Sequence, residues 1–272
     1  MDTLLGVGPF DAVKQLTQAF PLSVVCDMIG IPQEDRGRLL PWASALFDGF
    51  GPPNERWRAA QGPTQEVFTY AFSPDLPSRL LPGSAGAHIF AAVGQGRLTY
   101  QQGATLMVAY LAAALDTTIS SLQHVIHLLG QNESEWRKLR ARPELIPDAY
   151  NEALRLGTPV RGFCRVATEP YEFDGVRLNA GARVLLLFAA ANRDPRAWNE
   201  PDKFDISRGG TPHLSFGHGV HLCAGAALAR LEGHCMLDAL VRKVSTIQIH
   251  SATPTPNNMI HAYGELQISL HR

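Results

Sequence analysis

The run from Phe216 to Gly225, FGHGVHLCAG, places Cys223 among closely spaced glycines just ahead of a segment with helical character. Glycines permit the backbone conformations of a tight loop and let a flat ligand approach the chain closely. A thiol near a helix start lies close to the positive end of the helix dipole, which favours the thiolate. A thiolate held in this way is suited to serve as an axial ligand of iron. The alternative for an isolated cysteine is a buried small apolar side chain.

An acid and two hydroxyls end an apolar segment in the middle of the chain. The segment 104–115 carries no charge and is followed directly by Asp116, Thr117 and Thr118. Burying an acid among apolar residues costs free energy unless the acid has a partner or a function. An acid beside an alcohol can relay protons into a dry cavity. The alternative is that Asp116 pairs with a distant cation while Thr117 only packs.

A further pair of charges has helical spacing. Glu152 and Arg155 lie three residues apart in a segment expected to be helical, so their side chains share one face. Taken alone, such a pair is expected to be a surface ion pair that contributes little to stability.

The elements that must position these residues are mostly helices. The hydrophobic pattern predicts one long helix over 99–129, which Thr99 and Gln102 begin as a capping box. Shorter helices are expected at 64–72, 133–142 and 147–156, and a final helix at 223–243. Strands are expected near 165–167, 171–173 and 184–188, with loops over 49–63 and 73–86 and an irregular stretch over 193–213.

Composition limits the classes of function. The chain has 272 residues, is 45% hydrophobic and carries a net charge of −1, so it can bury a large core and shows no basic surface for nucleic acid. Its four cysteines form no C-x-x-C pair, which argues against a zinc site or a disulfide framework. The start lacks the pattern of a secretory signal, and the longest apolar run is too short to cross a membrane. We therefore expect a cytoplasmic protein without membrane or nucleic-acid partners.

In their order and content these motifs resemble those of cytochrome P450s, most closely the soluble bacterial members. The F-G-x-G-x-H-x-C-x-G loop of that family is matched at every fixed position, and E-x-x-R is matched by Glu152 and Arg155. The A-G-x-D/E-T-T motif is matched over 113–118 except that Ala114 replaces glycine. A weaker resemblance connects the chain to members that oxidise para-substituted aromatic acids, although a small residue replaces the expected hydroxyl near Ala112.

The resemblance implies a fold that is mainly α with small β-sheets, the cytochrome P450 fold, and haem b (iron protoporphyrin IX) as the cofactor. It implies that Cys223 ligates the iron, that Thr117 steers dioxygen and that Asp116 supplies protons. The residues implied to contact haem are Ala113, Ala114, Arg165, Phe216, Gly217, Gly219, His221, Cys223 and Gly225, with Arg165 and His221 on the propionates. A structural role is implied for Glu152, Arg155 and Arg208, and the substrate pocket is implied at Val160, Arg161, Phe163 and Met259.

The resemblance covers nearly the whole chain, which we expect to be a single domain over 1–272. The first sheet strands, the loop that roofs the substrate pocket and one propionate-binding helix of the family precede the matched motifs. The chain is therefore expected to be an N-terminally truncated P450, its C-terminal two-thirds.

Two functions follow. The first is a monooxygenase that takes electrons from a ferredoxin- or flavodoxin-type partner and inserts one atom of O2 into a small hydrophobic substrate, with aromatic compounds as one class. The second is a non-catalytic remnant that binds haem weakly or not at all. At Arg161, contact with an anionic group of the substrate is one hypothesis and a solvent-facing side chain is the other.

Overall fold

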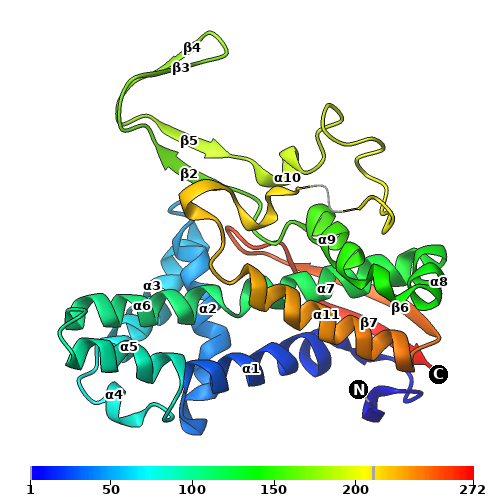
Figure 1. The fold of residues 1–272 in the computed structure, drawn as a ribbon, viewed down its shortest axis with the longest axis horizontal. Helices are drawn as coiled ribbons and strands as arrows, with labels where there is room; N and C mark the ends of the chain where they lie inside the picture. Colours follow the sequence, from blue (N-terminus) through cyan, green and yellow to red (C-terminus); the bar gives the residue numbers. More distant parts are fainter. Residues whose placement is uncertain (1, 210–211) are drawn as a thin grey trace.

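The computed structural model describes residues 2–209 and 212–272, a mainly helical fold with three small antiparallel sheets (Figure 1). Positions 210 and 211, within the irregular stretch predicted over 193–213, lie outside the described residues, as does position 1. The helices are α1 Ala19–Ile29, α2 Leu39–Gly49, α3 Glu55–Ala71, α4 Leu76–Arg79, α5 Ala85–Gly94, α6 Tyr100–Ala113, α7 Asp116–Gln131, α8 Glu133–Ala141, α9 Ile146–Gly157, α10 Phe188–Ala191 and α11 Ala226–Lys243.

Two of the sheets pair strands that are close in sequence, whereas the remaining sheet also pairs a strand near the start of the chain with one near its end. β1 (Phe10–Asp11) pairs with β7 (Ala262–His271), and β7 pairs with β6 (Thr246–Thr255), so this sheet has the order β1-β7-β6. The other two sheets each contain two strands. They are β2 (Phe163–Val166) with β5 (Arg183–Leu186), and β3 (Tyr171–Phe173) with β4 (Val176–Leu178). Figure 1 shows the β3–β4 hairpin projecting from the body of the molecule.

Two apolar cores lie side by side along the axis of α6 and α7. One core is built from α1, α2, α3, α5 and α6, and ends at Leu115 and Ile119. The other is built from α7, α8, α9 and α11 with the β1-β7-β6 sheet, and its first residue along α7 is Leu122. Residues Tyr100–Gln131 are apolar enough and long enough to cross a membrane, but they form the central elements of these two cores.

The long helix predicted over 99–129 is instead two helices. α6 ends at Ala113 and α7 begins at Asp116, with Ala114 and Leu115 between them. The capping box at Thr99 and Gln102 is present as predicted. The break lies where the two cores meet, and the Thr117 hydroxyl there bonds to the Ala113 carbonyl, a contact of a kind that often bends helices.

Two other boundaries also differ from the sequence prediction. The final helix begins at Ala226 rather than at residue 223, because residues 219–221 form a separate short 3-10 turn and Gly225 is the N-cap. The helix expected over 64–72 begins earlier, at Glu55, where the side chain of Asn54 accepts a hydrogen bond from Trp57 N. Pro63 lies inside that helix, so its presence there did not mark a loop.

Candidate functional site

Cys223 lies in the loop 216–225, which we call the cysteine loop. Two of its glycines, Gly217 and Gly219, have φ of 71° and 68°, a region that side chains rarely adopt. The backbone N–H of Cys223 donates to the carbonyl of Phe216 at 2.8 Å, which closes the loop. Cys223 is not covered by other protein atoms in this loop.

The break between α6 and α7 forms the second part of the candidate site. The hydroxyl of Thr117 donates to the carbonyl of Ala113 at 2.9 Å, at the last residue of α6. Ala113 is exposed and Ala114 is partly exposed, so this short segment has an open side. α11 packs against α7, and Figure 1 shows both helices starting near this junction, with the cysteine loop leading into α11.

Asp116, the first residue of α7, is partly buried on the wall of a cavity of about 180 Å³. Burial first, and the negative charge of Asp48 second, raise the pKa of Asp116 from 3.8 to about 7. A carboxyl group with this pKa can hold a proton and release it near neutral pH, as the acid member of a proton relay must do.

Glu152, Arg155 and Arg208 come together as a buried fork beneath the irregular segment that precedes the cysteine loop. Arg155 donates from Nε and Nη2 to the two carboxylate oxygens of Glu152 at 2.7 and 2.9 Å. Arg208 donates from Nε to Oε1 of Glu152, also at 2.9 Å. Arg155 further donates to the carbonyls of Asn192 and Pro201, each at 2.7 Å. The fork therefore connects α9 to the irregular segment.

The two side chains expected at the haem propionates lie on separate elements. Arg165 is on β2 and His221 is on the short turn just before Cys223. Arg165 donates only to the neighbouring carbonyl of Cys164, at 3.0 Å. Among the described residues, neither side chain is in a salt bridge with a carboxylate. Both are therefore available to a bound carboxylate.

The four residues assigned to the substrate pocket lie close together. Val160 pairs with Ile260 in an isolated β-bridge, and Arg161 N donates to the carbonyl of Met259 at 3.4 Å. The ring of Phe163 lies 6.4 Å from that of Phe50. The Arg161 side chain is exposed.

Two aromatic residues near this group were missed by the sequence analysis. Phe47 packs in the cluster of Val160 and Met259, and its ring lies 6.1 Å from that of Phe50. Phe47 is in the last turn of α2 and Phe50 is its C-cap residue, and apolar residues at such positions indicate no more than a core face. Nothing in the sequence alone brings this end of α2 to residues more than a hundred positions away.

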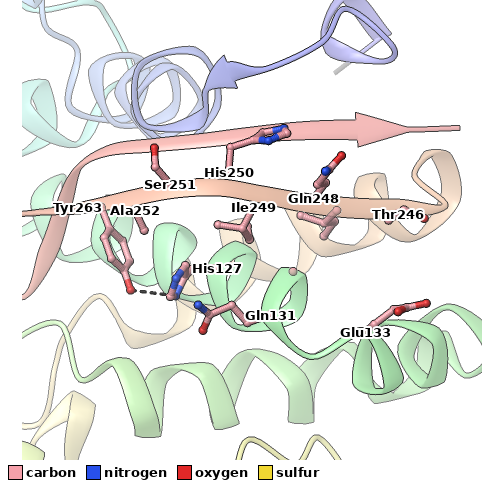
Figure 2. Close-up of a pocket in the computed structure, with 12 residues that line it drawn as sticks. His127, Gln131, Glu133, Thr246, Gln248, Ile249, His250, Ser251, Ala252 and Tyr263 are labelled. Carbon is pink, nitrogen blue, oxygen red and sulfur yellow. Dashed lines mark hydrogen bonds between the residues drawn. The ribbon is translucent and has the colours of Figure 1, made fainter.

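A larger cavity, of about 700 Å³, lies between the end of α7 and β6 (Figure 2). His127 and Tyr263 face each other there, with 2.9 Å between Nδ1 and the phenolic oxygen. None of the residues predicted to carry chemistry lines this cavity. The size of this cavity therefore does not point to the residues predicted to carry chemistry.

The model of the cytochrome P450 family matches residues 87–264. The chain belongs to the cytochrome P450 family. It is 39% identical over 264 residues to cytochrome P450 CYP199A2 from Rhodopseudomonas palustris, covering 97% of this chain. It is also 34% identical over 245 residues to the biotin biosynthesis cytochrome P450 of Bacillus subtilis, covering 85% of this chain. This P450 chain spans 64% and 60% of the lengths of these two relatives.

Solved structures confirm the predicted fold class for this P450 chain. The structure of P450BioI in complex with hexadec-9Z-enoic acid ligated acyl carrier protein matches with a TM-score of 0.90 and 30% identity. That match covers 99% of this chain and 71% of the other. CYP109E1 from Bacillus megaterium, in complex with testosterone, matches with a TM-score of 0.87 and 27% identity, covering 96% and 71%.

Membership in the family implies a haem cofactor, and the residues present fit that group. The thiol of Cys223 is exposed at the end of a loop whose glycines leave open space: a Cβ on Gly219 would meet no atom within 4 Å, and one on Gly225 would lie 3.8 Å from Sγ. Val220 and Leu222 on the same loop are exposed apolar side chains. A single soft donor with apolar neighbours, together with the Arg165 guanidinium and the His221 imidazole, matches an iron porphyrin that carries two carboxylates.

Proposed function

We propose that this chain provides the haem-binding and oxygen-handling part of a haem-thiolate monooxygenase. The reaction would insert one atom of O2 into a small organic substrate. The observation that carries the proposal is the position of Cys223 in a glycine-containing loop that leads into α11, which packs on α7. The alternative of a non-catalytic remnant is not favoured, because the cysteine loop and the acid–alcohol pair are both intact in the sequence.

The cofactor would be haem b, with Cys223 as the axial ligand and Arg165 and His221 binding the propionates. A guanidinium suits a carboxylate by charge and geometry, and an imidazole N–H can donate a hydrogen bond to one. When bound, haem with a thiolate ligand supplies the activation and cleavage of dioxygen. The hydrogen bond from Cys223 N to the Phe216 carbonyl fixes the backbone that carries the thiol. Gly217, Gly219 and Gly225 allow close approach, and Phe216 anchors the loop on the core.

Proton supply is assigned to Asp116 and Thr117. Because burial and Asp48 raise the pKa of Asp116 to about 7, this carboxyl group can give up a proton at neutral pH and regain it. The Thr117 hydroxyl, one residue on, bonds to the Ala113 carbonyl and so lies across the break between the helices. Ala113 and Ala114 leave this segment open on the side where oxygen would bind. Glu152, Arg155 and Arg208 have a structural role, since they hold the segment that precedes the cysteine loop.

The substrate is proposed to be small and mainly apolar, because Val160, Phe163 and Met259 gather with Phe47 and Phe50. The exposed Arg161 next to them would meet an anionic group, such as the carboxylate of an aromatic acid. Electrons would come from a ferredoxin- or flavodoxin-type donor that docks near the cysteine loop, where the path to the iron is shortest. A cytoplasmic location fits such a donor.

The reduced carbon monoxide difference spectrum tests the proposal. The full chain, loaded with haem, is expected to show the Soret band typical of thiolate ligation. Cys223→Ser should abolish this band, because a serine oxygen is a much poorer donor to the iron. Cys235→Ser is the matched control, since Cys235 is also exposed but lies on α11 away from the loop. A band that survives Cys223→Ser, or that is lost equally in the control, contradicts the proposal.

Binding spectra test the assignment of Arg161. Wild-type protein should prefer an aromatic acid over its neutral ester, and Arg161→Ala should lose that preference because the guanidinium charge is gone. An unchanged preference would favour a solvent-facing role for Arg161.

A further inference from the structure

The side-chain amide of Asn192, the C-cap residue of α10, lies where three segments of the chain meet. Asn192 is 1% exposed. Its Oδ1 accepts a hydrogen bond from Leu214 N at 2.7 Å, just ahead of the cysteine loop. Its Nδ2 donates to Thr158 Oγ1 at 2.9 Å and to Ser215 Oγ at 3.0 Å. The amide therefore connects the end of α9 with the two residues that lead into the cysteine loop.

The two hydroxyl groups that face this amide already donate their protons elsewhere. Thr158 Oγ1 donates to the carbonyl of Arg155, and Ser215 Oγ donates to the carbonyl of Leu154, each at 2.7 Å. Because a hydroxyl group has a single proton, both oxygens can only accept from Asn192. The position therefore requires a side chain with one acceptor and two donors. An asparagine supplies this set, whereas an ionised aspartate of the same size has no donor.

Thr158 is also the first residue of the segment 158–163, which we call the pocket wall because it carries residues assigned to the substrate pocket. Its φ is 40°, a left-handed conformation that a β-branched residue rarely adopts. Such a conformation persists only where surrounding contacts hold it. Here the contacts are the hydrogen bonds of the Thr158 hydroxyl and the one from His261 N to the Pro159 carbonyl, at 2.8 Å. A shift of the pocket wall is therefore felt at the Thr158 hydroxyl and, through it, at Asn192.

The short helix α10 forms a second connection between the pocket wall and the same amide. The ring of Phe188, the first residue of α10, lies 6.5 Å from the ring of Phe163, and Ala189 N donates to the carbonyl of Arg161 at 3.1 Å. At the other end of α10, Asn192 N donates to the Phe188 carbonyl at 2.9 Å. α10 also packs on the short turn in which the cysteine loop begins. Because α10 has only four residues, a movement of its first residue also moves the amide.

We propose that Asn192 is a positioning residue that couples the pocket wall to the cysteine loop, so that the backbone carrying Cys223 responds to what fills the pocket. The carbonyl of Phe216, which accepts from Cys223 N, directly follows Leu214 and Ser215, the two residues that the amide holds. A substrate that moves the pocket wall therefore moves the backbone of the thiol that would ligate the iron. The inference rests on the proposed function for the identity of the pocket and of the iron ligand.

Hydrogen exchange of the backbone amides of residues 214–223, followed by mass spectrometry on the full chain, measures this coupling with or without haem. Asn192→Asp is the decisive variant, because it keeps the size of the side chain but turns an oxygen toward two hydroxyl oxygens that cannot donate. Exchange in this segment is expected to rise about fivefold. Trp198→Phe is the matched control, because it removes a hydrogen bond to the carbonyl of Ala191 and leaves the amide in place. It should leave exchange of residues 214–223 unchanged.

Phe163→Leu tests whether a change in the pocket wall reaches the cysteine loop. The smaller side chain alters the contact with Phe188, so exchange of residues 214–223 should rise in the wild-type background. In the Asn192→Asp background the same change should add nothing, because the connection is already broken. Thr158→Val keeps the branched shape and removes only the hydroxyl, so it should raise exchange in the same segment even if Asn192→Asp fails to fold.

A spectroscopic measurement extends the test to the haem-loaded chain. The Soret band typical of thiolate ligation, in the reduced carbon monoxide complex, should decay several-fold faster in Asn192→Asp than in Trp198→Phe. A general loosening of this part of the chain would instead shorten the lifetime of the band equally in both variants.

Three results would overturn the inference: wild-type exchange of residues 214–223 in Asn192→Asp or Thr158→Val, no effect of Phe163→Leu on that segment, or an effect of Phe163→Leu that persists undiminished in the Asn192→Asp background. The failures of the two proposals are distinguishable. Absence of the thiolate band from the wild-type chain would remove the monooxygenase without changing the exchange rates, and unchanged exchange rates would remove the coupling while haem ligation stood.

Discussion

The fork at Glu152 and the cavity at Asp116 handle a carboxyl group in the protein interior in opposite ways. Glu152 accepts hydrogen bonds from two guanidinium groups and from the backbone N–H of Asp205, at distances between 2.7 and 3.1 Å. Asp116 faces a cavity whose described lining carries no cation, and its pKa is raised by burial first and by the charge of Asp48 second. The charge of Glu152 is therefore balanced by several donors, whereas Asp116 has no counter-charge among the described residues that line its cavity.

The different partners of the two carboxyl groups suit them to different roles, a structural role for Glu152 and proton transfer for Asp116. A carboxylate whose oxygens are all engaged has no freedom to take up a proton, so Glu152 is suited to hold segments together. A carboxyl group without a cation is in reach of a proton at neutral pH, which makes its site a candidate for proton transfer. The two roles follow from the partners of each side chain and not from its residue type.

Glu152→Gln should produce the largest effect on stability. The change leaves the guanidinium of Arg155, which is buried, without its counter-charge, and the expected loss is about 3 to 5 kcal/mol in the free energy of unfolding. Urea denaturation measures it. The matched comparison is Asp116→Asn, which removes a charge without stranding a cation. A loss from Glu152→Gln no larger than that from Asp116→Asn would erase the distinction between the two sites.

Asp116→Asn should change how stability depends on pH. The pKa of Asp116 is about 7 in the folded protein and 3.8 in its ordinary state, so the folded chain binds more protons between these values. Its contribution to stability is present below about 3.8 and is lost as the pH rises through about 7. Asp116→Asn lacks this loss, so its stability relative to wild type should increase over that range. Urea midpoints at several pH values measure it, and a constant difference would contradict the raised pKa.

The buried histidines should show the opposite sign. Burial lowers the pKa of His124 from 6.5 to about 3, with smaller contributions from His261, His127 and Arg161, while its Nε2 lies 2.9 Å from the carbonyl of His261. Stability is therefore lost as the pH falls from about 6.5 toward 3, because only the unfolded chain takes up that proton. His124→Gln keeps a donor for the carbonyl and should flatten this acid slope. An unchanged slope would mean that other groups cause it.

Features that lie within one continuous stretch of residues could be predicted from the sequence. The cysteine loop, the acid–alcohol pair and the capping box at Thr99 are each read from a few neighbouring residues, and α8 and α9 appear close to their predicted bounds. These features depend on local conformation and spacing, which a short stretch of chain already determines. Membership in the P450 family and the mainly helical fold were predicted correctly for this reason.

Features that depend on distant contacts were not predictable in this way. The break at Ala114 and Leu115 reflects two cores meeting, and the apolar run alone favours an unbroken helix. In the sequence, Asp48 is an ordinary acidic residue near the end of a helix. Its surroundings depend on the packing of α2 on α7 and on the hydrogen bond that it accepts from Asn258 N. The cavity at Asp116 is likewise built from segments far apart along the chain.

The smallest effect is expected from Arg196→Ala, which tests whether good geometry alone makes a charged pair stabilising. Arg196 donates to Asp194 from Nε and Nη2 at 2.6 to 3.1 Å, a geometry comparable to that of the buried fork. The hydrogen bonds from Arg196 lower the pKa of Asp194 to about 2, but the Arg196 side chain is 90% exposed. Water and salt screen such a pair, so the urea midpoint should remain the same within error. A loss approaching that of Glu152→Gln would mean that geometry and not burial sets the contribution of the fork.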